Sequence, residues 1–177
     1  RINSQLFSGY LSYSPNKYFN AQIGNDKQFW GEGYRSLFLS DNSSNNPYLK
    51  LTTNFWRIKY VYLLNVMRYG PVNGFTVDNN PTHFKTKYGA YHLVSVDVTK
   101  WMQFNFFEGV TWFHNDSNRV RGMEVSYLIP VAFIRPVEFA LGSPDNVVLG
   151  IGMKFKASPK QIFYTQIMLD DMDVGAA

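Results

Sequence analysis

The feature that most constrains this chain is a two-residue alternation of apolar and polar side chains. Between Trp56 and Met67 the even positions are mostly large and apolar, whereas the odd positions include Arg57, Lys59 and Asn65. The same period runs through residues 146–156. Successive side chains of a strand point to opposite faces, whereas a helical stripe repeats about every 3.6 residues. The pattern therefore predicts half-buried β-strands and an all-β fold.

Tyr, Phe, Thr, Val and Asn dominate the remaining sequence, which also favours strands. The expected strands are 5–13, 17–25, 47–53, 55–67, 88–98, 101–113, 121–128, 146–156 and 161–169. The alternation is irregular from Phe104 to Glu108, and a β-bulge near Phe106–Phe107 would explain this. Nine strands is an odd number, whereas bacterial outer-membrane barrels normally have an even one. Either the count is wrong or the chain is part of a larger barrel.

Short and long connections alternate along the chain. Tight turns are expected at 14–16, 53–54, 99–100 and 157–160, and long loops at 26–46, 68–87 and 129–145. Short turns at one end and long loops at the other are typical of outer-membrane barrels. With these strands, the loop 129–145 falls on the short-turn side. That position indicates a missed strand or a segment folded into the lumen.

Composition excludes several classes of protein. The chain has 177 residues, with 17 Lys and Arg against 13 Asp and Glu, no Cys and 45% hydrophobic residues. These values exclude a disordered chain, a disulfide scaffold and a Cys-based zinc site. The most apolar stretch, Val125 to Ile134, is too short for a spanning helix and contains Pro130. The basic residues are scattered, so no nucleic-acid patch is expected. Residues 1–177 are expected to form a single β-barrel domain or a fragment of one.

The two predicted faces favour an antiparallel transmembrane β-barrel with long loops. Aromatic residues stand near predicted strand ends, as in the interfacial girdles of membrane barrels; these residues are Tyr13, Tyr18, Trp56, Trp101 and Trp112. We expect Ile58, Tyr62 and Leu64 to face lipid, and Arg57, Lys59 and Asn65 to face the lumen or other protein. A soluble barrel of lipocalin size or a β-sandwich has a similar length and strand count, so this alternative stays open.

Two segments carry a resemblance to a known family. The first is FWGEGYRSLFLSD from Phe29 to Asp41, followed by PYLKL at 47–51 and FWRIKY at 55–60; the second is IRPVEF at 134–139 with LGSPDN at 141–146. Over about residues 9–169 the chain resembles the Wzi-type capsule-assembly outer-membrane proteins of Bacteroidota. It is most similar to their gliding-motility-associated, RemB-like branch. Members of that family are much longer than this chain, so the resemblance implies a fragment.

The resemblance implies a large, non-enzymatic β-barrel of the bacterial outer membrane. Its expected role is capsule or surface-polysaccharide assembly or attachment, or gliding and surface adhesion. The implied partners are surface polysaccharide, outer-membrane lipid and other outer-membrane, secretion or gliding proteins, without nucleic acid. A soluble, secreted carbohydrate-binding β-domain is the alternative.

The loop from Asn25 to Asp41 is the densest candidate for a polysaccharide site. Aromatic rings could stack on sugars while charged groups bind hydroxyls; the candidates are Asp26, Trp30, Glu32, Tyr34 and Arg35. A second loop adds Arg135 and Glu138, beside Asp145. The competing interpretation is structural, because buried charges are normally paired. In that case Arg35 would pair with Glu32, Glu138 or Asp145 and hold the loop inside the barrel.

No motif indicates catalysis, a metal or a cofactor. His83, His92 and His114 lack the spacing of metal ligands, and Asp170, Asp171 and Asp173 lack a calcium loop. Glu108 and Glu124 could supply the two carboxylates of a glycan-processing enzyme. The distance between two such carboxylates decides that chemistry, and the sequence does not fix it.

Overall fold

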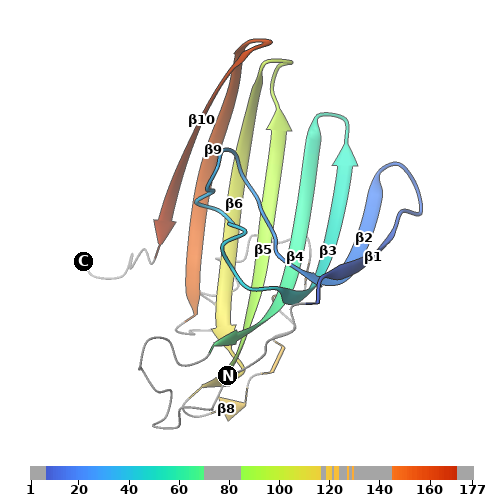
Figure 1. Ribbon diagram of the computed structural model, residues 1–177, viewed down its shortest axis with the longest axis vertical. Coiled ribbons are helices and arrows are strands. Elements are labelled where there is room, and N and C mark those ends of the chain that lie inside the picture. The colour runs from blue at the N-terminus through green and yellow to red at the C-terminus, as the bar shows by residue number, and fades with distance from the viewer. Residues whose placement is uncertain are drawn as a thin grey trace.

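The computed structural model of this protein describes residues 7–69, 85–116, 119–120, 122–123, 127, 129 and 145–170. Within them the fold is all-β, with one eight-stranded antiparallel sheet in the order β1-β2-β3-β4-β5-β6-β9-β10 and a second sheet made of β7 and β8 (Figure 1). The strands are β1 (Gly9–Tyr13), β2 (Phe19–Asp26), β3 (Asn46–Phe55), β4 (Ile58–Tyr69), β5 (Lys85–Asp97), β6 (Met102–Phe113), β7 (Asn115–Asp116), β8 (Arg119–Val120), β9 (Asn146–Ser158) and β10 (Gln161–Asp170).

The sheet is open. Strands β1 and β10 stand at its two edges, and in the described part of the chain they do not pair with each other. The all-β, antiparallel prediction is therefore confirmed, whereas a closed barrel is not seen. The prediction of nine strands is wrong for this sheet. Gly122, Met123 and Tyr127 are not in strand conformation, and the other residues of the expected strand 121–128 lie outside the described residues.

Because β9 pairs directly with β6, every short turn lies at one end of the sheet and every long connection at the other. Figure 1 shows the turns β1–β2, β3–β4, β5–β6 and β9–β10 along the upper edge. We call these the turn end and the loop end. Strand β6 ends and β9 begins at the loop end, so the segment between them leaves and rejoins the sheet there. The expectation that the connection before β9 starts from the short-turn side is therefore wrong; of residues 129–145 themselves, all but Ile129 and Asp145 lie outside the described residues.

Register gives the sheet two chemically different faces, because directly opposed residues in antiparallel strands point to the same side. The apolar face carries, one per strand from β1 to β10, Leu11, Ile23, Leu51, Ile58, Val94, Phe106, Ile151 and Ile167. The polar face carries, in the same order, Ser12, Gln22, Lys50, Lys59, Ser95, Asn105, Lys154 and Gln166.

Each face has its own core cluster. On the polar face, the loop 27–45 packs Trp30 and Phe38 against Phe107. On the apolar face, at the loop end, Tyr127 covers a group that includes Trp112. Tyr62 and Leu64 lie under this cover, with Tyr62 only 2% exposed. They share a face with Ile58 as expected, but other parts of the protein cover them, so the expectation that they face lipid is wrong.

Two local predictions also fail. The register between β6 and both neighbours runs through Phe106 and Phe107 without a shift, so there is no bulge there; a shift occurs at Gln161/Ile162 instead. The alternation is irregular because Phe107 and Glu108 point to opposite faces and both are buried. The turn expected at 53–54 lies at Trp56–Arg57, where Trp56 adopts a positive φ of 54°.

Candidate functional site

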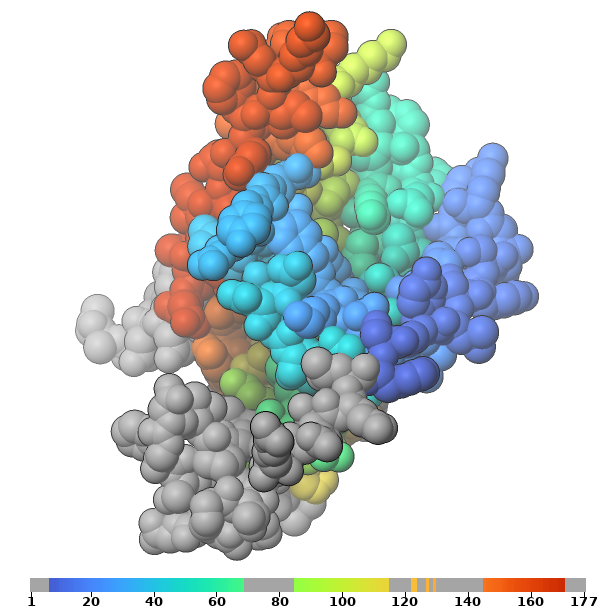
Figure 2. Space-filling model, in the orientation of Figure 1, coloured from blue at the N-terminus to red at the C-terminus, as the bar shows by residue number. Residues whose placement is uncertain are grey.

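A polar cavity of about 560 Å³ lies between the loop 27–45 and the polar face of the sheet. The loop leaves β2 at the loop end, runs in front of β6 and β9, and returns to the start of β3 (Figure 1). In the space-filling view its blue-to-cyan atoms cover the middle of this face (Figure 2). A long segment thus folds back over the sheet and encloses space against the strands.

Aromatic packing anchors the loop to the sheet. The Trp30 indole is 7% exposed and meets Phe107 edge-on, with ring centroids 6.3 Å apart. Phe38 stacks on Phe107 at 5.0 Å. Gly150 permits this approach, since a Cβ there would lie 2.5 Å from the Phe38 ring. The anchoring rings therefore come from the loop and from β6, and the missing side chain of Gly150 in β9 leaves space for Phe38.

Polar contacts fix the rest of the loop. The Lys154 ammonium donates to the Glu32 carboxylate at 2.8 Å, and the Leu37 backbone N–H donates to Gln166 Oε1 at 3.0 Å. Gly31 and Gly33 have φ of 120° and 86°, a region that favours glycine. The glycine-rich sequence therefore lets the loop bend tightly enough to present Glu32 to β9.

Donors and acceptors line the cavity from the strand side. The Tyr48 hydroxyl donates to Gln22 Oε1 at 3.1 Å, and the Lys50 ammonium donates to Gln28 Oε1 at 3.3 Å. The ammonium of Lys50 also lies 5.6 Å from the centre of the Tyr48 ring. Further polar lining residues are Asp26, Lys59, Ser95, Gln103 and Asn105. This lining is rich in amide, hydroxyl and ammonium groups, which suits a polyhydroxylated ligand.

Asp26 is the last residue of β2 and lies at the loop end of the sheet. The Lys27 backbone N–H donates to its carboxylate at 2.8 Å. This bond, and a second from the Ser8 side chain, lower the pKa of Asp26 below its usual value, with Lys27 and Lys50 adding favourable charge. The carboxylate therefore stays anionic at neutral pH beside the cationic part of the cavity.

The structure separates the residues predicted for a polysaccharide site. Asp26, Trp30 and Glu32 line the cavity, but the Trp30 indole is buried and Glu32 is paired with Lys154. Tyr34 is 87% exposed, and the Arg35 guanidinium lies 5.5 Å above its ring. These two do not line the cavity. Arg135 and Glu138 lie outside the described residues.

Sequence reasoning missed the strand side of the cavity. Gln22, Lys50, Lys59, Gln103 and Asn105 all stand at polar positions of the alternating pattern. That alternation was a usable signal for which residues share a face. It did not reveal which of them lie beneath the loop.

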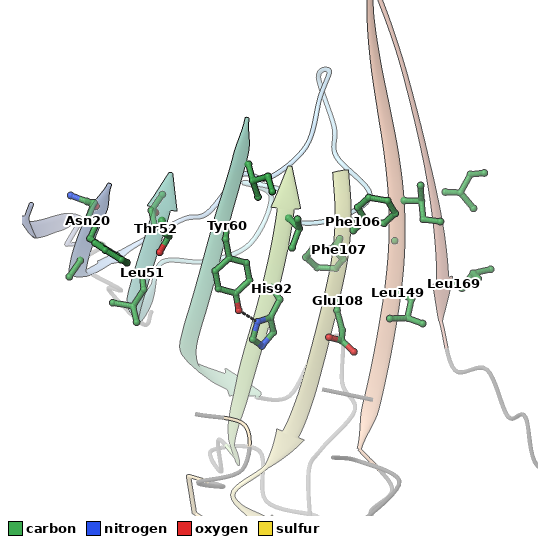
Figure 3. Close-up of a pocket in the computed structure, with 18 of the residues that line it drawn as sticks. Asn20, Leu51, Thr52, Tyr60, His92, Phe106, Phe107, Glu108, Leu149 and Leu169 are labelled. Atoms are coloured by element: carbon green, nitrogen blue, oxygen red, sulfur yellow. Dashed lines mark hydrogen bonds between the residues drawn. The ribbon is translucent and has the colours of Figure 1, made fainter. Parts of the chain in front are cut away.

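The apolar face contains an open trough of about 910 Å³ that runs from Tyr13 of β1 to Leu169 of β10. Tyr60, His92 and Glu108 line this trough from the adjacent strands β4, β5 and β6 (Figure 3). The Tyr60 hydroxyl is hydrogen-bonded to His92 Nδ1, and His92 Nε2 has no hydrogen-bond partner in the structure as described. Glu108 stands opposite His92 in the register and is buried. Its suggested partner for glycan cleavage, Glu124, lies outside the described residues.

Across the described ranges, no three His, Asp or Glu side chains group closely enough to hold a metal ion. In the same ranges no helix has the length and hydropathy needed to cross a membrane. Comparison of the chain with models of known families, with curated proteins and with solved structures finds no match.

Proposed function

We propose that this chain forms part of the wall of a bacterial outer-membrane β-barrel, and that the polar cavity contributes to attaching or assembling a surface polysaccharide. The protein would be non-enzymatic. Gliding and surface adhesion are processes in which such attachment would operate. The observation that carries the proposal is the apolar face, where large apolar side chains are exposed on several strands, while most of the charged and amide groups lie on the opposite face.

The exposed apolar side chains favour a lipid environment. Ile23, Ile151 and Ile167 are 60%, 55% and 63% exposed, and all point to the apolar face on three different strands. Burying one such side chain fully is worth about 1.5–3 kcal/mol. Soluble monomers rarely leave a wide contiguous patch of this kind in water. A bilayer would cover it without a second protein layer.

The strand lengths and the exposed aromatic side chains support the same proposal. A membrane-spanning strand needs about 9–11 residues, and β3, β4, β5, β6, β9 and β10 have 10 to 13. Exposed aromatic side chains gather at the turn end, among them Tyr18, Trp56 and Trp101. Tyr and Trp prefer the interface between membrane and water.

The polar face would then line the barrel interior. The loop 27–45 folds over that face, and its Glu32 pairs with Lys154 of the wall. Between them the cavity offers Lys50, Gln103 and Asn105 to a ligand. Such groups bind sugar hydroxyls or acidic substituents through hydrogen bonds. In this proposal the cavity, more than the outer side of the loop, contacts the polysaccharide.

A soluble, secreted carbohydrate-binding domain is the second candidate, because one observation favours it. At the loop end, Tyr127 covers the apolar face: Trp112 is 1% exposed, and the Tyr62 hydroxyl donates to the Tyr127 carbonyl at 3.0 Å. In a soluble domain, other parts of the protein would cover the whole apolar face in the same way. This candidate keeps the same polar cavity as its binding site.

Substitutions inside and outside the cavity test the polysaccharide role. We expect Lys50→Met and Gln103→Leu to reduce the polysaccharide retained on cells while the level of folded protein stays unchanged. Tyr34→Ala, on the exposed side of the loop, is the matched control and should retain it. If Tyr34→Ala and Arg35→Ala release polysaccharide while the cavity variants do not, the outer side of the loop is the site and the cavity assignment is wrong.

A further inference from the structure

Each of the four short turns of the large sheet carries one cationic side chain. The cations are Lys17, Arg57, Lys100 and Lys160. All four are exposed, and the turn segments 14–18, 56–57, 98–101 and 159–160 contain no Asp or Glu. We call these four residues, with the aromatic side chains beside them, the turn rim. Because all four turns lie at the turn end, the rim is a line of positive charge along one edge of the sheet (Figure 1).

Aromatic rings accompany the cations in three of the turns. The Lys17 ammonium lies 5.0 Å from the centre of the Tyr18 ring, and the Arg57 guanidinium lies 5.2 Å from that of Trp56. Trp101 follows Lys100 directly in sequence. Trp56 has a left-handed backbone conformation, and its side chain is 83% exposed. An exposed aromatic ring beside a cation is complementary to a surface that presents both apolar and anionic groups.

The cations of the rim have not been neutralised by the protein. In the described segments no carboxylate forms an ion pair with any of the four. The acid nearest in sequence to the β5–β6 turn, Asp97, accepts a hydrogen bond from Gln103 at 2.8 Å. Arg57 donates to the Val98 carbonyl at 2.8 Å, which orients its guanidinium without cancelling its charge. The positive charge thus remains available to an external anion.

We propose that the turn rim binds the phosphate groups of anionic phospholipids at the membrane surface next to the turns. This proposal rests on the membrane location argued above. Cations near an anionic membrane surface each contribute roughly a fivefold gain in affinity. Trp and Tyr settle at the depth of the headgroups, where their rings meet acyl chains and their polar atoms meet water. The rim would therefore set the depth and tilt of the sheet in the bilayer.

Vesicle binding tests this proposal. The chain is mixed with phosphatidylcholine vesicles, with and without phosphatidylglycerol, and the fraction that floats with the vesicles is measured. The rim variant is Arg57→Gln with Lys100→Gln. The matched control is Lys27→Gln with Lys87→Gln, which removes the same charge from the loop end of the sheet. We expect the preference for phosphatidylglycerol to fall roughly 25-fold for the rim variant only, and to weaken in high salt.

Equal loss of preference in both variants would show that net charge alone attracts the vesicles and would overturn the proposal. Unchanged preference in the rim variant would overturn it as well. If the rim binds a soluble anionic glycan and shows no preference for phosphatidylglycerol vesicles, its partner is a glycan, and the proposal is overturned. Insertion is measured separately, by quenching of a fluorophore at Ile151→Cys with nitroxides on lipid tails. If the fluorophore is quenched but the chain has no preference for phosphatidylglycerol, only the proposal about the turn rim is wrong. If the fluorophore is not quenched, the proposed membrane location is wrong.

Discussion

Replacing Trp30 with alanine tests whether the loop 27–45 is fixed to the sheet by its aromatic anchor. The indole is 7% exposed and packs on Phe107 and the rest of the polar-face cluster. A large aromatic side chain buries about 150–250 Å², and at about 25 cal/mol per Å² that corresponds to at most roughly 6 kcal/mol. Measured Phe and Trp to Ala changes cost about 3–5 kcal/mol. We therefore expect Trp30→Ala to destabilise the docked loop by about 4 kcal/mol.

Hydrogen exchange of the loop amides measures this change directly. Leu37 donates its N–H to Gln166 and Leu39 donates to the Trp30 carbonyl, so both amides exchange when the loop opens. A cost of about 4 kcal/mol corresponds to a roughly thousandfold rise in the open population. Tyr34→Ala is the control, because Tyr34 is 87% exposed and such substitutions usually change stability by less than about 0.5 kcal/mol. Similar exchange rates in the two variants would refute the anchoring role.

Three further predictions concern the loop and the two faces. In a double-mutant cycle of Glu32→Gln and Lys154→Met, the partly exposed pair should show a coupling energy of about 1 kcal/mol, and additive effects would mean that the pair does not hold the loop. Gly31→Ala should lower the melting temperature, since φ is 120° and a Cβ would lie 2.1 Å from the Ser36 hydroxyl; an unchanged value would contradict this backbone conformation. Leu11→Arg should reduce the amount of assembled protein in membranes far more than Ser12→Arg, with a cost of about 2–4 kcal/mol at a lipid-facing site near mid-bilayer, and equal tolerance would argue against the face assignment.

The strands could be predicted because their signal is local. The alternation along β4 and β9 depends only on neighbouring residues, and both strands occur within a few residues of their expected limits. The turn at Trp56–Arg57 could not be predicted in the same way. Its first residue has a left-handed conformation that a tryptophan rarely adopts, so the preceding Asn54 looked like the better turn residue.

The site could be predicted only in part, because its two sides are far apart in sequence. The loop containing Asp26, Trp30 and Glu32 was recognisable from its mixture of aromatic, charged and glycine residues. The wall residues that complete the cavity, such as Lys50 and Gln103, come from β3 and β6. Their place beneath the loop depends on the stacking of Phe38 on Phe107, a contact between residues about seventy positions apart that no local pattern specifies.

The proposed membrane location requires that lipid covers the apolar face. The chain contains no cysteine, so a single introduced cysteine can carry a fluorophore without background labelling. We would label Ile23→Cys and Ile167→Cys on the apolar face, and Ser12→Cys and Gln22→Cys on the polar face, in protein reconstituted into bilayers. Nitroxides attached to the lipid tails should quench the first pair strongly and the second pair little. Equal quenching of the two faces, or a protein that stays in solution and is not quenched at either face, would contradict the account.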